Sequence, residues 1–275
     1  MKSLQEFISE KLKVSKTSSK KTKVSSRNEL RELILNRVDK EGKDCDLNDI
    51  DVSDVDDMSG IFYDTDFQGD VSEWDVSKVK DMFAVFQGCN KFNCDLSGWD
   101  VSNVKSMSYM FQGCDRFNQD ISDWDMSHVA DTSFMFHGCA DFDQDLSSWK
   151  FNNLRNAKYM FFRCKSFNSD LNDWDMSHCK NTAHMFEMCS EFNGNISDWD
   201  VSYVIDMNGM FGSCNKFNCD LSKWNPKSVT DISSMFSSCK KFDCDLSGWK
   251  LPNLKHQDYT FFNCVSLKKK PTFAV

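Results

Sequence analysis

Apolar residues recur along this chain with a fixed period of 25 residues. Nine units begin at residues 46, 70, 95, 120, 145, 170, 195, 220 and 245, and the first is one residue short. All the tryptophans occupy one position of the unit: Trp74, Trp99, Trp124, Trp149, Trp174, Trp199, Trp224 and Trp249. A Phe follows twelve residues later in every unit, and a Cys occupies a further position in eight of them. Such a period predicts stacked units that bury one continuous core.

Within one unit the pattern predicts a short helix and a short strand. Apolar residues between Val104 and Cys114 lie at offsets 0, 3, 6, 7 and 10, which is the spacing of one helical face. Asp100 precedes them and is a good N-cap residue. Residues 117–121 contain few helix formers and are expected to add a strand to a parallel ladder. The expected fold is therefore an α/β repeat solenoid of the leucine-rich-repeat type.

The consensus of the units is WDVSxVxxMxxMFxxC/AxxFNxDLS. This string is similar to the repeat of the BspA-like leucine-rich repeat family, and the resemblance covers residues 46–269. It implies a right-handed solenoid without catalytic residues. Many members of that family are exported adhesins, and their commoner residue in the Cys column is Ala.

The repeats and the segments outside them divide the chain into four predicted regions. Residues 1–25 form a flexible basic leader with a short amphipathic helix, and residues 26–45 form an N-terminal capping helix. Residues 46–269 are the nine-unit solenoid, and residues 270–275 are a C-terminal tail. The cap is expected because a bare end of a solenoid would expose core residues.

The leader has three interpretations. It is a loosely ordered tail, or an amphipathic helix that lies on a membrane surface, or a targeting peptide. Its first ten residues, MKSLQEFISE, resemble the capsid-targeting leaders of internal head proteins in T-even-type phages. That resemblance implies cleavage after Glu10 and a structural or packaged phage head protein as the alternative function.

Composition and charge narrow the choice of partner. The 275 residues carry a formal charge of −9, and residues 1–26 hold seven Lys and two Glu, a charge of +5. The rest of the chain therefore carries −9 − 5 = −14, which disfavours nucleic acid binding by the solenoid. No stretch of 18 apolar residues predicts a membrane span, and no apolar segment predicts a signal peptide. We expect a cytoplasmic protein, or a virion-associated one under the phage alternative, with its 13 Cys reduced.

Two columns of polar residues are candidates for chemistry. The Cys column is expected to be a buried apolar column, with redox or metal chemistry as the alternative. Stacked Asp residues start eight of the nine units, and an Asp also follows five of the eight Trp. These Asp residues either accept backbone N–H bonds in their own turns or bind calcium. Asn195 keeps the pattern without a charge, which favours hydrogen bonding. No catalytic Ser, His and Asp arrangement and no phosphate loop is present, so we predict neither an enzyme nor a cofactor.

A binding site is expected where the units differ. Ten residues after each Trp, four neighbouring units present Tyr109, Phe134, Tyr159 and His184. Phe162 and Arg163 lie close by, and exposed aromatic residues beside an Arg are typical of protein interfaces. The alternative is that these rings stack on one another as part of the structure. The opposite, strand face offers a side-chain ladder or a polar site that would include Asn118, Asn168 and Asn193.

Overall fold

The computed structural model describes residues 21–271 and residue 273. Its regular elements are strand β1 (Thr22–Lys23), helix α2 (Arg27–Glu41) and strand β2 (Ile50–Asp51). The two strands pair in parallel, with Thr22 opposite Ile50. The predicted leader helix and the processing site at Glu10 lie outside the described residues.

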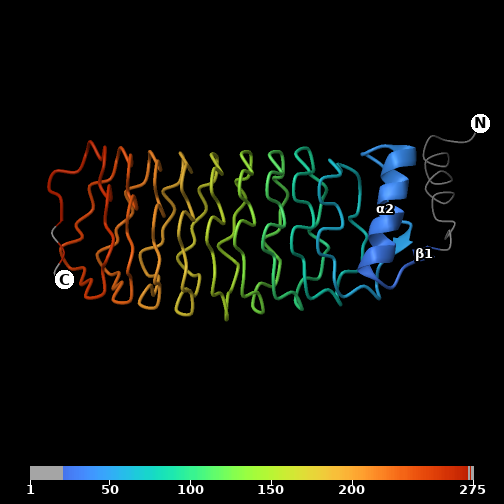
Figure 1. The fold of residues 1–275 in the computed structure, drawn as a ribbon, viewed down its shortest axis with the longest axis horizontal. Helices are drawn as coiled ribbons and strands as arrows, with labels where there is room; N and C mark the ends of the chain where they lie inside the picture. The colour runs from blue at the N-terminus through green and yellow to red at the C-terminus, as the bar shows by residue number, and fades with distance from the viewer. Residues whose placement is uncertain (1–20, 272, 274–275) are drawn as a thin grey trace, which may run out of the picture.

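The 25-residue units follow one another as successive coils along the long axis of the molecule (Figure 1). Helix α2 covers the first coil, and the C-terminal residues lie at the opposite end. We number the units in chain order, from unit one (residues 46–69) to unit nine (residues 245–269). Each unit therefore contacts mainly the unit before it and the unit after it.

Backbone hydrogen bonds hold each unit to the next. From unit three to unit four, N–H groups of Met107, Tyr109, Phe111 and Gly113 donate to the carbonyls of Asp131, Ser133, Met135 and His137 over 2.8–2.9 Å. The same four bonds recur between every pair of successive units. They satisfy backbone groups that would otherwise be buried without partners.

The short helix expected in each unit is wrong for the described residues, where α2 is the only α-helix. The segment from Met107 to Cys114 is a series of tight turns, in which Met110 N–H bonds back to the Met107 carbonyl over 3.2 Å. Tyr109 has φ 62°, which a right-handed helix does not allow. The helical spacing of the apolar residues suggested a helix because a series of turns of three or four residues brings the same positions to the core. Residues 117–121, where a short strand was expected, form no strand, and the isolated parallel bridges between units lie elsewhere, as from Ser106 to Asp131.

The Trp and Cys columns are buried and also join neighbouring units. The Trp149 indole N–H donates to the Ile121 carbonyl over 2.9 Å, and the Cys164 thiol donates to the Phe136 carbonyl over 2.9 Å. Both acceptors lie in the preceding unit, and each column repeats this contact along the stack. A column of Ala would leave the space of the Sγ atoms empty and would not supply the donor, which gives a physical reason for the cysteines.

Helix α2 is formed by the segment predicted as the N-terminal cap. It begins after Ser26, whose hydroxyl accepts the Glu29 N–H over 3.3 Å, and it ends at Gly42, which has φ 100°. Leu30 and Ile34 are fully buried against the first coil. Amphipathic burial thus fixes the helix on the end of the stack.

Candidate protein-binding surface

Four side chains form a continuous row on one side of the stack. We call Tyr109, Phe134, Tyr159 and His184 the aromatic row. All four residues have φ between 57° and 62°, in the left-handed region that is uncommon for residues other than Gly. Each uses its N–H to bond the next unit, so the backbone that carries the row is fixed by the stack.

The rings of the aromatic row stack on one another. Ring centroids are 4.5 Å apart from Tyr109 to Phe134, 4.7 Å from Phe134 to Tyr159 and 4.4 Å from Tyr159 to His184. The planes of these neighbours differ by no more than 17°. All four side chains are half-buried. The row is therefore a structural stack that hides the ring faces and leaves the ring edges at the surface.

A second group of side chains borders the row. The His137 ring stacks on Phe162 with centroids 4.7 Å apart, and the Arg163 guanidinium lies 5.2 Å from the Phe162 centroid. Phe162 also meets Tyr159 edge-on at 5.3 Å. Burial lowers the pKa of His137, which favours its neutral form. The structure thus brings together every residue predicted for this surface.

Different residues lie at the two ends of the aromatic row. At the N-terminal end the Phe83 ring, 43% exposed, tilts against Tyr109 at 5.5 Å. At the other end Gly209 has no ring to continue the row, and a Cβ there would clash with the His184 ring as it is placed. His184 Nδ1 lies 2.5 Å from Glu187 Oε2. Phe83 and Glu187 were not predicted from the sequence, because they lie outside the column that defines the row.

The opposite face carries a ladder of amide and carboxylate side chains. Asn118 Oδ1 accepts the Asp143 N–H over 2.9 Å, and Asn168 Oδ1 accepts the Asn193 N–H over 2.7 Å. Asn193 in turn accepts the Asn218 N–H over 2.7 Å. Of the two interpretations of these residues, the side-chain ladder is the one that the contacts support.

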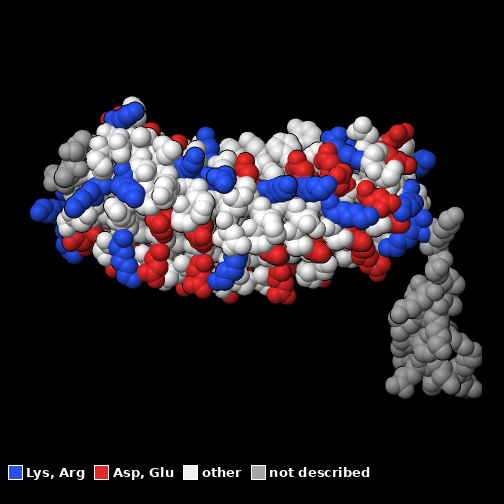
Figure 2. Space-filling model, turned by 90° about the horizontal axis from the view of Figure 1, so that it is seen from below, with Lys and Arg blue, Asp and Glu red and all other residues white. Residues whose placement is uncertain are grey.

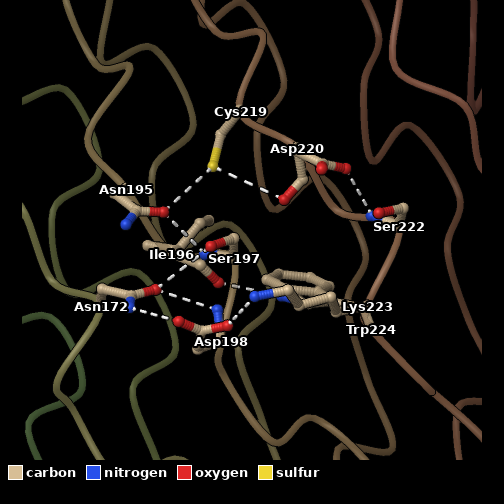
Figure 3. Close-up of polar contacts among 10 residues, drawn as sticks. All are labelled: Asn172, Asn195, Ile196, Ser197, Asp198, Cys219, Asp220, Ser222, Lys223 and Trp224. Carbon is tan, nitrogen blue, oxygen red and sulfur yellow. Dashed lines mark hydrogen bonds and ion pairs between the residues drawn. The ribbon is translucent and has the colours of Figure 1, made fainter.

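The stacked Asp residues accept backbone N–H bonds in their own turns. Asp220 Oδ1 accepts the Ser222 N–H over 2.9 Å, and Asn195 accepts the Ser197 N–H over 3.1 Å in the same geometry (Figure 3). The column after each Trp behaves in the same way, as for Asp100 and Ser102. These bonds lower the pKa of Asp220, because they stabilise its charged form. Within the described residues, no group of three or more His, Cys, Asp or Glu side chains is placed to hold a metal ion.

Of the five cysteines outside the main column, Cys179 is fully buried in the core, and the other four precede the Asp that starts a unit. Cys45 is buried, whereas Cys94, Cys219 and Cys244 are half-buried. The Cys244 thiol donates to the Cys219 carbonyl over 2.7 Å. Burial raises the pKa of Cys94 and of Cys244 to about 12, so neither thiol ionises readily at neutral pH.

A protein-family model matches the chain in three overlapping segments, residues 32–149, 114–190 and 158–273. Its description is "Mycoplasma protein of unknown function, DUF285". The chain belongs to the DUF285 family. The overlapping matches confirm that this DUF285 protein is a repeat protein. No curated protein is similar to it.

The charged side chains are mixed on the face drawn in Figure 2, where acidic and basic residues interrupt one another along the stack of the DUF285 protein. Ion pairs also join neighbouring units, such as Lys216 with Glu191 and Arg116 with Asp141. Within the part of the chain that the structure describes, no helix has the length and apolar character needed to cross a membrane.

Proposed function

We propose that this protein is a non-enzymatic recognition module that binds another protein through its aromatic row, on a repeat solenoid of the BspA-like type. The observation that carries the proposal is the unbroken row of half-exposed ring edges from Tyr109 to His184. Aromatic residues next to an Arg, here Arg163, are enriched in the energetic centres of protein interfaces.

The geometry of the rings favours a protein over other ligands. Sugars and nucleobases are bound by stacking on aromatic faces, but the faces of the row are covered by their neighbours at 4.4–4.7 Å. Ring edges instead offer a strip of apolar surface that suits aliphatic and aromatic side chains. The polar groups of Arg163 and Glu187 border this strip and would orient a partner.

A non-enzymatic role is supported by the state of the potential nucleophiles. Cys114, Cys139 and Cys164 are fully buried, and burial raises their pKa well above the ordinary value. The Asp side chains that recur in each unit are already engaged by backbone N–H groups.

The test is capture of partner proteins by the full chain and by the double variant Phe134→Ala/Tyr159→Ala, with quantification of each captured protein. We expect capture of a specific partner to fall more than about tenfold. Loss of stacked pairs should also lower the melting temperature by a few degrees, at about 0.5–1.5 kcal/mol for each pair.

The matched control is Tyr203→Ala, which removes an aromatic side chain that is 57% exposed and lies away from the row. Capture should be unchanged in this variant. If both variants hold the same partners as the unmodified chain, the aromatic row is not the binding surface.

A further inference from the structure

The hydrogen bonds between units have a single direction on the side of the stack that carries the aromatic row. In unit one, the N–H groups of Met58, Gly60, Phe62 and Asp64 donate to carbonyls of unit two. Every later unit up to unit eight donates from the equivalent four positions to the unit that follows it. Separate bonds run the other way, as from Lys105 N–H to the Lys80 carbonyl and from Asp141 N–H to the Asp115 carbonyl. The four forward columns therefore present carbonyls at the N-terminal end and N–H groups at the C-terminal end.

Two arginines of α2 occupy the carbonyl end. The Arg31 guanidinium donates to the carbonyls of Ile61, over 3.0 Å, and of Tyr63, over 3.4 Å. The Arg27 side chain donates to the carbonyl of Ser59. In every other unit the equivalent carbonyls accept N–H groups of the preceding unit. In unit one the two arginines supply donors in place of those N–H groups.

The N–H end has no comparable partner. The equivalent donors in unit nine are the backbone N–H groups of Gln257, Tyr259, Phe261 and Asn263, and no described residue accepts any of them. Tyr259 and Asn263 have φ 59°, which repeats the alternation of right- and left-handed residues. Successive N–H groups in that alternation form concave sites for anionic or carbonyl oxygens.

The same end combines apolar exposure with positive charge. Tyr259, Phe262 and Val265 are 72%, 59% and 73% exposed. Residues 245–271 hold Lys250, Lys255, Lys268, Lys269 and Lys270 against Asp245 and Asp258, a formal charge of 5 − 2 = +3. Basic side chains gather at this end, on the left of Figure 2.

Among the described residues of the tail, Phe273 covers part of the end. The Phe273 ring lies 6.1 Å from that of Trp249 and 6.3 Å from that of Phe261, so it packs over the end of the core. Tyr259, Phe262 and Val265 remain exposed beside it. The four N–H donors and these three side chains form what we call the open end.

We propose that the open end binds an extended acidic segment of a partner protein, whose carbonyl and carboxylate oxygens accept the four N–H groups. The segment would add one more rung to the ladder, as an extended peptide adds a strand to a sheet edge. Its negative charge complements the lysines of residues 245–271. This surface is separate from the aromatic row, and the proposal does not depend on binding there.

A second copy of this chain fits the open end less well. Two open ends would face each other with donors on both sides and no acceptors. The only complementary surface, the carbonyl end of another copy, is already occupied by Arg27 and Arg31. An acidic extended segment of another protein supplies both the free acceptors and the negative charge.

The test uses the full chain and three fluorescent ten-residue peptides, in which Val alternates with Glu, with Gln or with Lys. Val favours the extended conformation in all three. By fluorescence anisotropy we expect the Glu peptide to bind about tenfold more tightly than the Gln peptide, and the Lys peptide to show no binding. Added salt should weaken the Glu peptide's binding. Equal binding of the three peptides would overturn the proposal.

The variant Tyr259→Ser/Phe262→Ser/Val265→Ser should weaken binding of the Glu peptide about tenfold. Its matched control is Tyr203→Ser/Ile205→Ser, which removes exposed apolar side chains (57% and 44%) from unit seven and should bind as the unmodified chain does. Retained binding by the triple variant would overturn the site.

Two measurements on the unmodified chain keep the proposal testable if the triple variant does not fold. Amide hydrogen exchange of Tyr259, Phe261 and Asn263 should slow when the Glu peptide is added, and unchanged exchange would contradict the proposal. Sedimentation should show no self-association without peptide. If the chain self-associates and this slows the same amide exchange, the occupant of the open end is a second copy of the chain and not a partner protein.

Discussion

The two ends of the stack carry the same repeating unit but differ in what covers it. At the N-terminal end, a helix outside the repeat buries Leu30 and Ile34 and supplies guanidinium donors to three carbonyls of the ladder. At the C-terminal end, Phe273 packs over part of the core and the backbone donors have no described acceptor. Units of the same pattern are therefore expected to differ in stability and in chemistry according to their neighbours. In a repeat protein the contacts between units, rather than the unit itself, hold most of the stability.

The largest expected effect compares the first and last members of one Phe column. Phe62 is fully buried, and Phe62→Ala should lower the free energy of unfolding by about 3–5 kcal/mol. Phe261 is half-buried, so Phe261→Ala should cost about half as much. Urea unfolding of both variants measures the difference. Equal losses would mean that the C-terminal end is as well covered as the N-terminal one.

A smaller effect is expected from removing one cap donor. Arg31→Met keeps an apolar stem but leaves the Ile61 and Tyr63 carbonyls without their donor, at a cost of about 1–3 kcal/mol in the free energy of unfolding. The control is Arg116→Met, which removes an ion pair of a side chain that is 69% exposed and should cost less than about 1 kcal/mol. If the two substitutions cost the same in urea unfolding, the arginine does not act as a cap.

The smallest effect is a dependence of stability on pH at the N-terminal end. Hydrogen bonds from Lys23 and Lys78 lower the pKa of Asp54 from 3.8 to about 2. Because the folded state holds the proton less tightly, this contribution is fully present above pH 3.8 and is lost as the pH falls towards about 2. Asp54→Asn should flatten the melting temperature against pH in that range. A profile that Asp54→Asn leaves unchanged would show that the pair does not stabilise the fold.

The burial of the repeating residues could be predicted from the sequence, because a given core position takes the same residue type in successive units. The Trp column and the Cys column are buried as their spacing suggests, and the family match confirms the repeat. The sequence did not indicate that each unit contains tight turns instead of a helix. Tyr109 and Phe134 adopt φ 62° and 59°, although aromatic residues give no signal for the left-handed region.

The surface residues were predicted only in part. The aromatic row was found because its members recur every 25 residues, whereas Phe83 joins it from a neighbouring position that does not repeat. The role of Arg31 was missed for a related reason. Its acceptors lie about 30 residues away, on backbone carbonyls that carry no signature in the sequence.

The backward reach of the Trp and Cys side chains has a consequence for synthesis. Trp149 and Cys164 both donate to unit four, which leaves the ribosome before unit five does. The Trp and Cys donors of each emerging unit therefore find their acceptors already in place. Its four forward N–H groups need only the next unit, so no contact between neighbouring units has to wait for a distant part of the chain. A nascent chain of this protein is expected to acquire its structure one coil at a time, starting from α2, as translation proceeds.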